Sequence, residues 1–416
     1  MSRSPYDTST QPGAPRRAVP SPPQQNPYVP KGSPAAPLRR RPRPRPRAQA
    51  SRHGSASVPQ DDRSHMDGTP PQAPTGSRGR GRARHGCLST LLWIVMAAVV
   101  ALLALRTLPS SMASGPAVPE LVSFVPVAVV PSVICLVLAM LWHRRVLALV
   151  CLLALAVNGS WHAGYLVGRQ RVSAEAQAAV AASPTTDDAY ARVMTLNTYN
   201  GQASAAQVVS LVRERHVEVL CLQELTDGMV EDLERAGIDE LLPYHVVSEG
   251  ASAISNGGRN GIWTAAPQAD VSRNLLPIDT SSMPAASVQV GGTTVRIVSV
   301  HPNSPVRGAQ DLWDEGLSVI GSLSDYGHAY LIMGDFNSTW DHARFRSLLG
   351  TTFEDAGEAS GEGVHMTYPA NGIVPPLVEI DHIVYSSGSG IVVSSLETAH
   401  VAGTDHLALI GTLEAR

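Results

Sequence analysis

The chain has 416 residues and a formal charge of -3, but this near-neutral total hides an uneven distribution. Residues 1–86 hold 16 basic and four acidic side chains, a net charge of +12, whereas residues 173–416 hold 11 and 30, a net charge of -19. Such asymmetry indicates segments in different environments and excludes one uniform domain. Only one of the four cysteines, Cys221, lies in the acidic region, which excludes a disulfide framework there.

Residues 1–86 are expected to form a disordered, basic cytoplasmic tail. Residues 1–85 contain 17 of the 32 prolines and almost no large aliphatic side chains, so they cannot bury enough apolar surface to offset the entropy of ordering the backbone. The Arg-Pro run from Arg39 to Arg47 has two interpretations. It is either a ligand for a polyproline-binding module or anionic lipid, or a solvated tail that only fixes topology.

Apolar runs free of charged residues predict three transmembrane helices within residues 87–168, at about 87–105, 121–142 and 146–166. The basic tail and the pair Arg144-Arg145 place the N-terminus and the second loop in the cytoplasm by the positive-inside rule. Everything after Gly168 is then expected outside the cytoplasm. Asn158 and His162 form either a functional intramembrane pair or an interfacial helix end.

The remaining chain divides into a linker at 169–189, which is small and polar, and a domain at 190–416 that is long enough to have its own core. Apolar periodicity predicts helices at 204–215, 227–236, 308–323 and from Asp341. Strands are expected at 193–197, 217–222, 244–248, 260–264, 285–290, 293–300, 330–333, 379–385, 391–397 and 407–413, with a hairpin at Gly291-Gly292. Helix-separated strands and hairpins together predict a mixed-sheet α/β domain.

Polar side chains stand at the ends of several of these buried strands. They are Asn197, Glu224, His301, Asp335 with Asn337, Asp381, and Asp405 with His406. Any one of them alone is more often a helix cap or a turn former. Strands that run into a cleft deliver their terminal side chains to one place, so the set together predicts a catalytic site.

Three motifs carry a resemblance to a known family: Leu222-Gln223-Glu224, Gly334-Asp335-Phe336-Asn337 and Thr404-Asp405-His406. With Asn197, His301 and Asp381 in the same order, the stretch from Arg192 to Leu413 resembles the endonuclease/exonuclease/phosphatase superfamily. That superfamily includes pancreatic-type deoxyribonucleases, abasic-site nucleases, inositol polyphosphate 5-phosphatases and neutral sphingomyelinases. The resemblance implies a four-layer α/β/β/α sandwich of two mixed sheets, with the active site at one edge.

Phosphodiester hydrolysis needs a hard cation on the phosphoryl oxygens, and oxygen ligands suit Mg²⁺ or Mn²⁺. Glu224 is the first metal ligand we expect. Asp405 adds a second carboxylate, and Asn197 adds a neutral oxygen or a hydrogen bond to the metal shell. A zinc site is disfavoured because none of the domain's nine histidines forms an HExxH or HxxEH pattern.

The remaining residues take catalytic roles in this hypothesis. Asp335 orients and deprotonates the attacking water, and the Asn337 amide fixes that carboxylate and the scissile phosphate. His406 donates a hydrogen bond to a phosphoryl oxygen and is held in one tautomer by Asp381. His301 is a second phosphate or leaving-group contact. Arg259 either reaches the phosphate from a Gly-rich stretch or belongs to a flexible hairpin.

The expected function is that of a membrane-anchored, extracytoplasmic, divalent-metal-dependent phosphoric ester hydrolase. Residues 173–416 contain no lysine and carry -19, whereas nucleic-acid binding draws most of its affinity from basic side chains. The substrate is therefore expected to be a lipid head group, a nucleotide or a short oligonucleotide, and no obligate protein partner is evident. One alternative is a nuclease acting on DNA or RNA. The other is a catalytically inactive, surface-binding domain of the same fold.

Overall fold

The structure is a computed structural model that describes residues 86–113, 115, 117–249, 259–278 and 280–416. The tail expected at 1–86 therefore lies outside the described residues except for Gly86, and so does most of the Gly-rich stretch before Arg259. Helices begin with α1 (Gly86–Arg106), α2 (Ser110–Ala113) and α3 (Val118–Val122). They continue with a 3₁₀ turn at Pro126–Ala128, α4 (Val129–Leu141) and α5 (Arg145–Trp161).

Helices α1, α4 and α5 surround a common apolar core that includes Met96, Val125, Cys135 and Cys151. Among the described residues, one helix is long and apolar enough to cross a membrane, at Cys87–Arg106, while the helical segments Pro126–Leu141 and Arg145–Trp161 are apolar but shorter. The second expected span is interrupted because Pro126, which lacks an N–H, opens a 3₁₀ turn rather than continuing a helix from α3. The expectation of three full-length spans is thus met by one helix.

The segment expected to be a flexible linker instead contains helix α6 (Ala174–Ala182). Its sequence is rich in alanine, the strongest helix former, and the Ser173 hydroxyl caps it by accepting a hydrogen bond from the Ala176 amide at 3.0 Å. Val172 and Ala176 are buried against Val392 of the domain. This part of the segment is therefore folded onto the domain.

The domain is built from two six-stranded mixed sheets. The first has the order β11-β12-β1-β2-β4-β3, and the second β5-β6-β7-β8-β10-β9. The first comprises β1 (Tyr190–Asn197), β2 (Val219–Leu225), β3 (Tyr244–Val247), β4 (Arg259–Thr264), β11 (Ile391–His400) and β12 (Leu407–Ala415). The second comprises β5 (Ala269–Ser272), β6 (Ala285–Val290), β7 (Thr293–Val300), β8 (Ala329–Asp335), β9 (Phe353–Asp355) and β10 (Asp381–Ser386).

Each sheet contains one parallel pair, β1 with β2 and β7 with β8, and its other pairs are antiparallel. Facing side chains of the two sheets share one apolar core, with Val193 and Cys221 from the first sheet and Ile297 and Met333 from the second. The fold is therefore α/β with two packed mixed sheets, as the sequence predicts.

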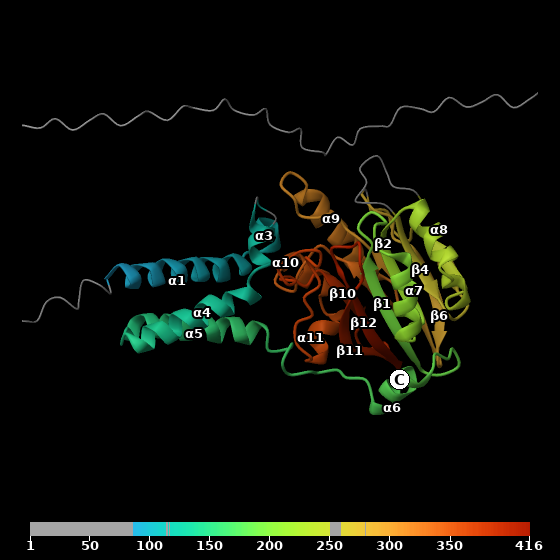
Figure 1. Ribbon diagram of the computed structural model, residues 1–416, viewed down its shortest axis with the longest axis horizontal. Helices are drawn as coiled ribbons and strands as arrows, with labels where there is room; N and C mark the ends of the chain where they lie inside the picture. The colour runs from blue at the N-terminus through green and yellow to red at the C-terminus, as the bar shows by residue number, and fades with distance from the viewer. Residues whose placement is uncertain (1–85, 114, 116, 250–258, 279) are drawn as a thin grey trace, which may run out of the picture. The chain divides into compact units, whose positions relative to one another are not determined.

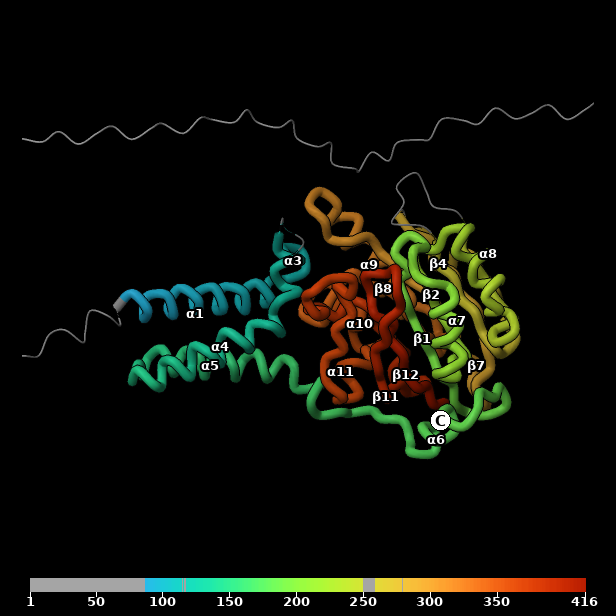
Figure 2. Tube along the Cα trace, in the orientation of Figure 1, coloured from blue at the N-terminus to red at the C-terminus, as the bar shows by residue number. Residues whose placement is uncertain are grey.

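Helices cover the outer faces of both sheets (Figure 1). Helices α7 (Ala205–Glu214) and α8 (Asp227–Arg235), followed by a 3₁₀ turn at Ile238–Glu240, pack on the first sheet. Helices α9 (Gln310–Gly321) and α10 (Ala343–Leu349), with a 3₁₀ turn at Ser322–Asp325 between them, pack on the second, and α11 (Ala356–Ser360) follows β9 (Figure 2). The layers therefore run helices, sheet, sheet, helices.

Candidate active site

The polar strand-end residues meet at one edge of the two sheets. Asn197 ends β1, Asp335 ends β8 and Asp381 begins β10. His301 directly follows β7, and His406 directly precedes β12. The Asn197 amide nitrogen donates hydrogen bonds to Glu224 Oε1 and to Asp335 Oδ2, both at 3.0 Å. Since Glu224 belongs to the first sheet and Asp335 to the second, this amide joins the two halves of the site.

Asn197 presents its nitrogen, and not its oxygen, to the two carboxylates. Its Oδ1 accepts a hydrogen bond from the Tyr199 amide at 2.9 Å. The side chain is almost fully buried. In this orientation its nitrogen positions Glu224 and Asp335 while its oxygen faces the Tyr199 backbone N–H.

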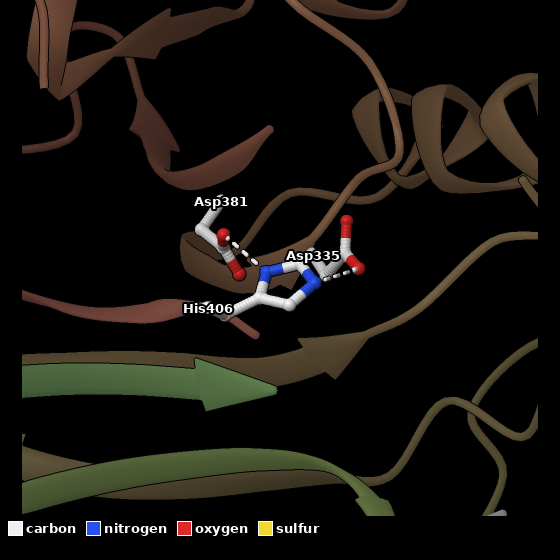
Figure 3. Close-up of side chains that lie close together, drawn as sticks. All are labelled: Asp335, Asp381 and His406. Carbon is white, nitrogen blue, oxygen red and sulfur yellow. Dashed lines mark hydrogen bonds and ion pairs between the residues drawn. The ribbon is translucent and has the colours of Figure 1, made fainter. Parts of the chain in front are cut away.

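His406 lies between two carboxylates (Figure 3). Its Nδ1 is hydrogen bonded to Asp381 Oδ2 at 2.8 Å, and its Nε2 is 3.6 Å from Asp335 Oδ2. Burial alone would lower the pKa of His406, but the negative charges of Asp381 and Asp335 outweigh it and raise that pKa to about 10. The ring of Tyr368 packs against the imidazole, with centroids 5.0 Å apart. The result is a cationic imidazole with a fixed orientation.

A bulge in β2 sets the direction of Glu224. The register of β2 against β4 shifts between Leu222 and Leu225, and Glu224 has the left-handed φ of 56°. Gln223 is fully buried and donates to Ser299 Oγ at 3.1 Å, while Glu224 Oε2 accepts from the Asn200 amide at 2.8 Å. Such bulges re-aim side chains next to active sites, and here the bulge brings the carboxylate of Glu224 to the cluster.

The loop after β8 holds Asp335 through its backbone. Gly334 has φ 155° and pairs with Val300 of β7 so closely that a Cβ would lie 1.9 Å from the Val300 carbonyl oxygen, so only glycine fits. The Asn337 amide N–H donates to Asp335 Oδ1 at 2.8 Å. The Asn337 side chain instead donates to the Pro302 carbonyl at 3.1 Å. The expected role of the Asn337 side-chain amide in fixing Asp335 therefore belongs to its backbone N–H.

His301 lies beside two of the carboxylates. Its Nε2 is 3.5 Å from Asp335 Oδ2 and 3.7 Å from Glu224 Oε1, and the side chain is almost fully buried. Burial is the largest influence on Asp335 and raises the pKa of that carboxyl, although the charges of His406 and His301 oppose it. A carboxyl with a raised pKa is a stronger base than an ordinary one, which suits proton abstraction from water.

The donor set fits a hard divalent cation. Asp381 Oδ1 and Asp405 Oδ1 are buried and have no hydrogen-bond partner among the described residues, and such unpaired carboxylate oxygens are the ligands that Mg²⁺ and Mn²⁺ prefer. Ligand atoms of Asp335, Asp381 and His406 also lie within 4.8 Å of one another. The cluster therefore offers oxygen donors for such an ion.

Sequence reasoning missed several residues around the cluster. The Tyr368 ring packs at a tilt against His406, and Trp313 donates its indole N–H to the Asn337 carbonyl at 3.1 Å. Neither follows a recognisable motif. Arg259 pairs with Asp227 of α8. Asp341, six residues beyond Asp335, pairs with Arg106. The sequence offers one hint of a role for Arg106, because it is the only basic residue in the first loop between apolar runs.

The two mixed sheets and the carboxylate and imidazole cluster at their edge define the class of protein as a phosphoesterase-like α/β sandwich. The chain belongs to the Endonuclease/Exonuclease/phosphatase family, whose model matches residues 194–406, slightly more than half of its length. A comparison with curated proteins gave no significant match.

Similar solved structures include the following three. D. rerio TDP2 complexed with a single-strand DNA product is 16% identical, with 55% of this chain and 100% of that chain covered and a TM-score of 0.45. A Staphylococcus aureus beta toxin variant with bound magnesium ions is 13% identical (54% and 99% covered, TM-score 0.39). Sphingomyelinase C from Streptomyces griseocarneus is 16% identical (54% and 99% covered, TM-score 0.37).

Proposed function

We propose that the protein is a membrane-anchored, extracytoplasmic, divalent-metal-dependent phosphoesterase that hydrolyses a small or membrane-presented phosphodiester or phosphomonoester. The observation that carries the proposal is the convergence of Asn197, Glu224, Asp335, Asp381 and His406 within hydrogen-bonding or ion-pairing distance. A domain used only for binding would not need a buried base, an oriented imidazolium and unpaired carboxylate oxygens in one place.

Glu224 and Asp405 would hold Mg²⁺ or Mn²⁺, and Asn197 would keep the Glu224 carboxylate in position. A bound cation would polarise the phosphoryl group and neutralise charge that develops in the transition state. This chain's own contribution is to fix the two carboxylates before substrate arrives, since a preorganised site does not reorganise during the reaction.

Asp335 is the candidate general base. Its Oδ1 is fixed by the Asn337 N–H, while its Oδ2 accepts from Asn197 and lies 3.6 Å from His406 Nε2. A water held between Asp335 and the phosphorus would lose its proton to this carboxylate. His406, kept cationic by Asp381, would donate from Nε2 to a phosphoryl oxygen and stabilise its negative charge.

The helical segments support an extracytoplasmic anchor. Arg106, at the end of α1, and His162, directly after α5, both contact the domain. Arg144 directly precedes α5 and Arg145 is its first residue, so both lie at the end of α5 opposite to His162. By the positive-inside rule this arrangement favours a cytoplasmic basic tail and a domain on the other side. External protease on intact spheroplasts is then expected to digest the domain and spare the tail, whereas the reverse pattern would contradict this topology.

The charge of the domain supports a small or lipid-linked substrate. Residues 173–416 contain no lysine and carry a net charge of -19, a field that repels a long polyanion within the screening distance of about 8 Å at physiological salt. Substrates presented at a membrane surface would be accessible to an anchored domain at all times.

The test uses the full chain in detergent micelles with bis-p-nitrophenyl phosphate and Mg²⁺, Mn²⁺ or EDTA. We expect turnover with either metal, none with EDTA, and a higher kcat/KM on a phospholipid or dinucleotide than on plasmid DNA at equal salt. A preference for plasmid DNA that falls steeply as salt rises would instead identify a nuclease. Absence of turnover on every substrate would favour an inactive binding domain.

A further inference from the structure

The ends of the helices near the domain bind the same loop that carries two catalytic residues. The carboxylate of Asp341 is fully buried, pairs with Arg106 at the end of α1 and lies 3.0 Å from His162 Nε2. Arg106 and His162 are each only 8% exposed. We call these three residues the Asp341 clamp. It joins three segments that are far apart in the sequence.

Further contacts surround the clamp. His342 Nε2 is hydrogen bonded to the Pro119 carbonyl at 2.9 Å, and the Arg346 guanidinium donates to the Arg106 carbonyl at 3.3 Å. The Arg106 guanidinium also lies 4.3 Å from the centre of the Trp161 ring. The start of α10 is therefore held at two points, because His342 binds the Pro119 carbonyl and Arg346 binds the Arg106 carbonyl.

The buried charges of the Asp341 clamp stabilise one another. Burial alone would raise the pKa of Asp341, but the hydrogen bond from His162 and the charge of Arg106 outweigh it and lower that pKa, so the carboxylate is ionised. Removing one partner of a buried pair is strongly destabilising, because an uncompensated charge remains, whereas replacing both by apolar groups is often neutral. A variant that replaces both partners can therefore test a role in the active site without a large loss of stability.

A short, well-connected loop links Asp341 to the catalytic centre. From Asp335 it passes through Asn337, whose carbonyl accepts from Trp313 at 3.1 Å, and Ser338, whose carbonyl is hydrogen bonded to His382 Nε2 at 2.8 Å. His382 is the neighbour of Asp381 in β10. A displacement at Asp341 would thus reach Asp335 along the chain and Asp381 through His382.

We propose that Asp341 is a positioning residue, held by Arg106 and His162 so that loop 335–342 keeps Asp335 in its catalytic arrangement. The helices then help to position the catalytic residues in addition to anchoring the domain. The kinetic side of this inference rests on the proposed phosphoesterase function, whereas its structural side does not.

The experiment compares two double variants of the full chain in detergent micelles. Arg106→Leu/Asp341→Leu removes the acidic member and the permanently charged basic member of the Asp341 clamp together, and His162, the remaining member, can lose its proton. Arg169→Leu/Glu358→Leu removes a second ion pair between the post-α5 segment and the domain, with Arg169 Nη1 2.6 Å from Glu358 Oε1, that is not attached to loop 335–342. We expect the first variant to lose at least about tenfold in kcat with KM changed less than about threefold, and the second to keep the wild-type kcat.

Hydrogen–deuterium exchange of metal-free protein gives the readout that does not need activity. Amides of residues 336–342 are expected to exchange faster in the clamp variant, while the rest of the domain and the thermal midpoint stay near wild type. In the control variant only the region of residue 358 changes. If turnover is absent in the wild type, the proposed function fails while exchange still tests the clamp.

Three results would overturn the proposal: wild-type kcat in the clamp variant, equal kcat loss in both double variants, or unchanged exchange at 336–342. If the double variant does not fold, Asp341→Glu keeps the negative charge beside Arg106 and lengthens the side chain by one methylene. It is then expected to show the same local exchange and kcat effects in smaller degree. Wild-type behaviour of Asp341→Glu in both measurements would also contradict the role.

Discussion

Replacing Asp381 by asparagine tests the electrostatic design of the site, because Asp381 has the strongest single influence among the carboxylates that keep His406 cationic. The pKa of His406 is raised from 6.5 to about 10, which corresponds to a preference for the imidazolium of about 5 kcal/mol. Asp381 Oδ2 lies 2.8 Å from Nδ1, compared with 3.6 Å from Nε2 to Asp335 and 3.9 Å to Asp405. We therefore assign at least about 2 kcal/mol to Asp381, so Asp381→Asn should weaken proton binding by about thirtyfold or more.

The assay is an NMR titration of the His406 ring in EDTA-treated protein, with the resonance assigned by its loss in His406→Gln. A matched control is Asp355→Asn, because His382 Nδ1 lies 3.1 Å from Asp355 Oδ1 in a similar buried pair and the pKa of His382 is raised to about 9 by that charge despite burial. The control should weaken proton binding at His382 and leave His406 unchanged. Proton affinity of His406 within about threefold of wild type in Asp381→Asn would refute the reasoning.

Other predictions concern the metal, the chemistry and stability. Glu224→Gln should weaken Mn²⁺ binding measured by electron paramagnetic resonance at least about tenfold, since few protein carboxylates hold the ion; unchanged affinity would exclude Glu224 as a ligand. Asp335→Asn and His406→Ala should each lower kcat on bis-p-nitrophenyl phosphate by about 10² to 10⁴, and near wild-type turnover would rule out the assigned roles. Burial raises the pKa of Glu218 to about 8, so the folded protein holds a proton that the unfolded chain releases between pH 4.5 and 8, and stability falls across that window. Glu218→Gln should therefore raise the thermal midpoint at pH 8.5 and leave it unchanged at pH 4.5, with exposed Glu231→Gln as the control; an equal effect at both pH values would contradict this linkage.

The strands and the polar residues at their ends could be predicted because they depend on local pattern. Buried strands such as β2 and β8 are continuous apolar runs, and their polar ends are visible in the sequence as Glu224 and Asp335. Short elements with little buried surface escaped prediction. The strand β5 (Ala269–Ser272) is mostly exposed, so no alternation of apolar and polar residues marks it.

Features that depend on tertiary pairing could not be read from the sequence. Arg106 and Asp341 are separated by 235 positions, and no sequence pattern around either residue predicts the other as its partner. The helix α6 was missed for a different reason: its alanines show no amphipathic period, and only the Ser173 cap and high helix propensity mark it. The direction of Glu224 depends on a bulge that one strand cannot reveal without its partner.

The position of β1 has a consequence for the order in which the protein folds. This first strand of the domain lies between β2 and β12, so Tyr190 pairs with Glu414 across nearly the whole domain sequence. During synthesis one edge of β1 must stay unpaired until β12 emerges, and exposed strand edges of this kind invite aggregation. His406 directly precedes β12, so the imidazole enters the catalytic cluster only as the sheet closes. A nascent chain therefore completes the cluster of Asp335, Asp381 and His406 only when β12 has formed.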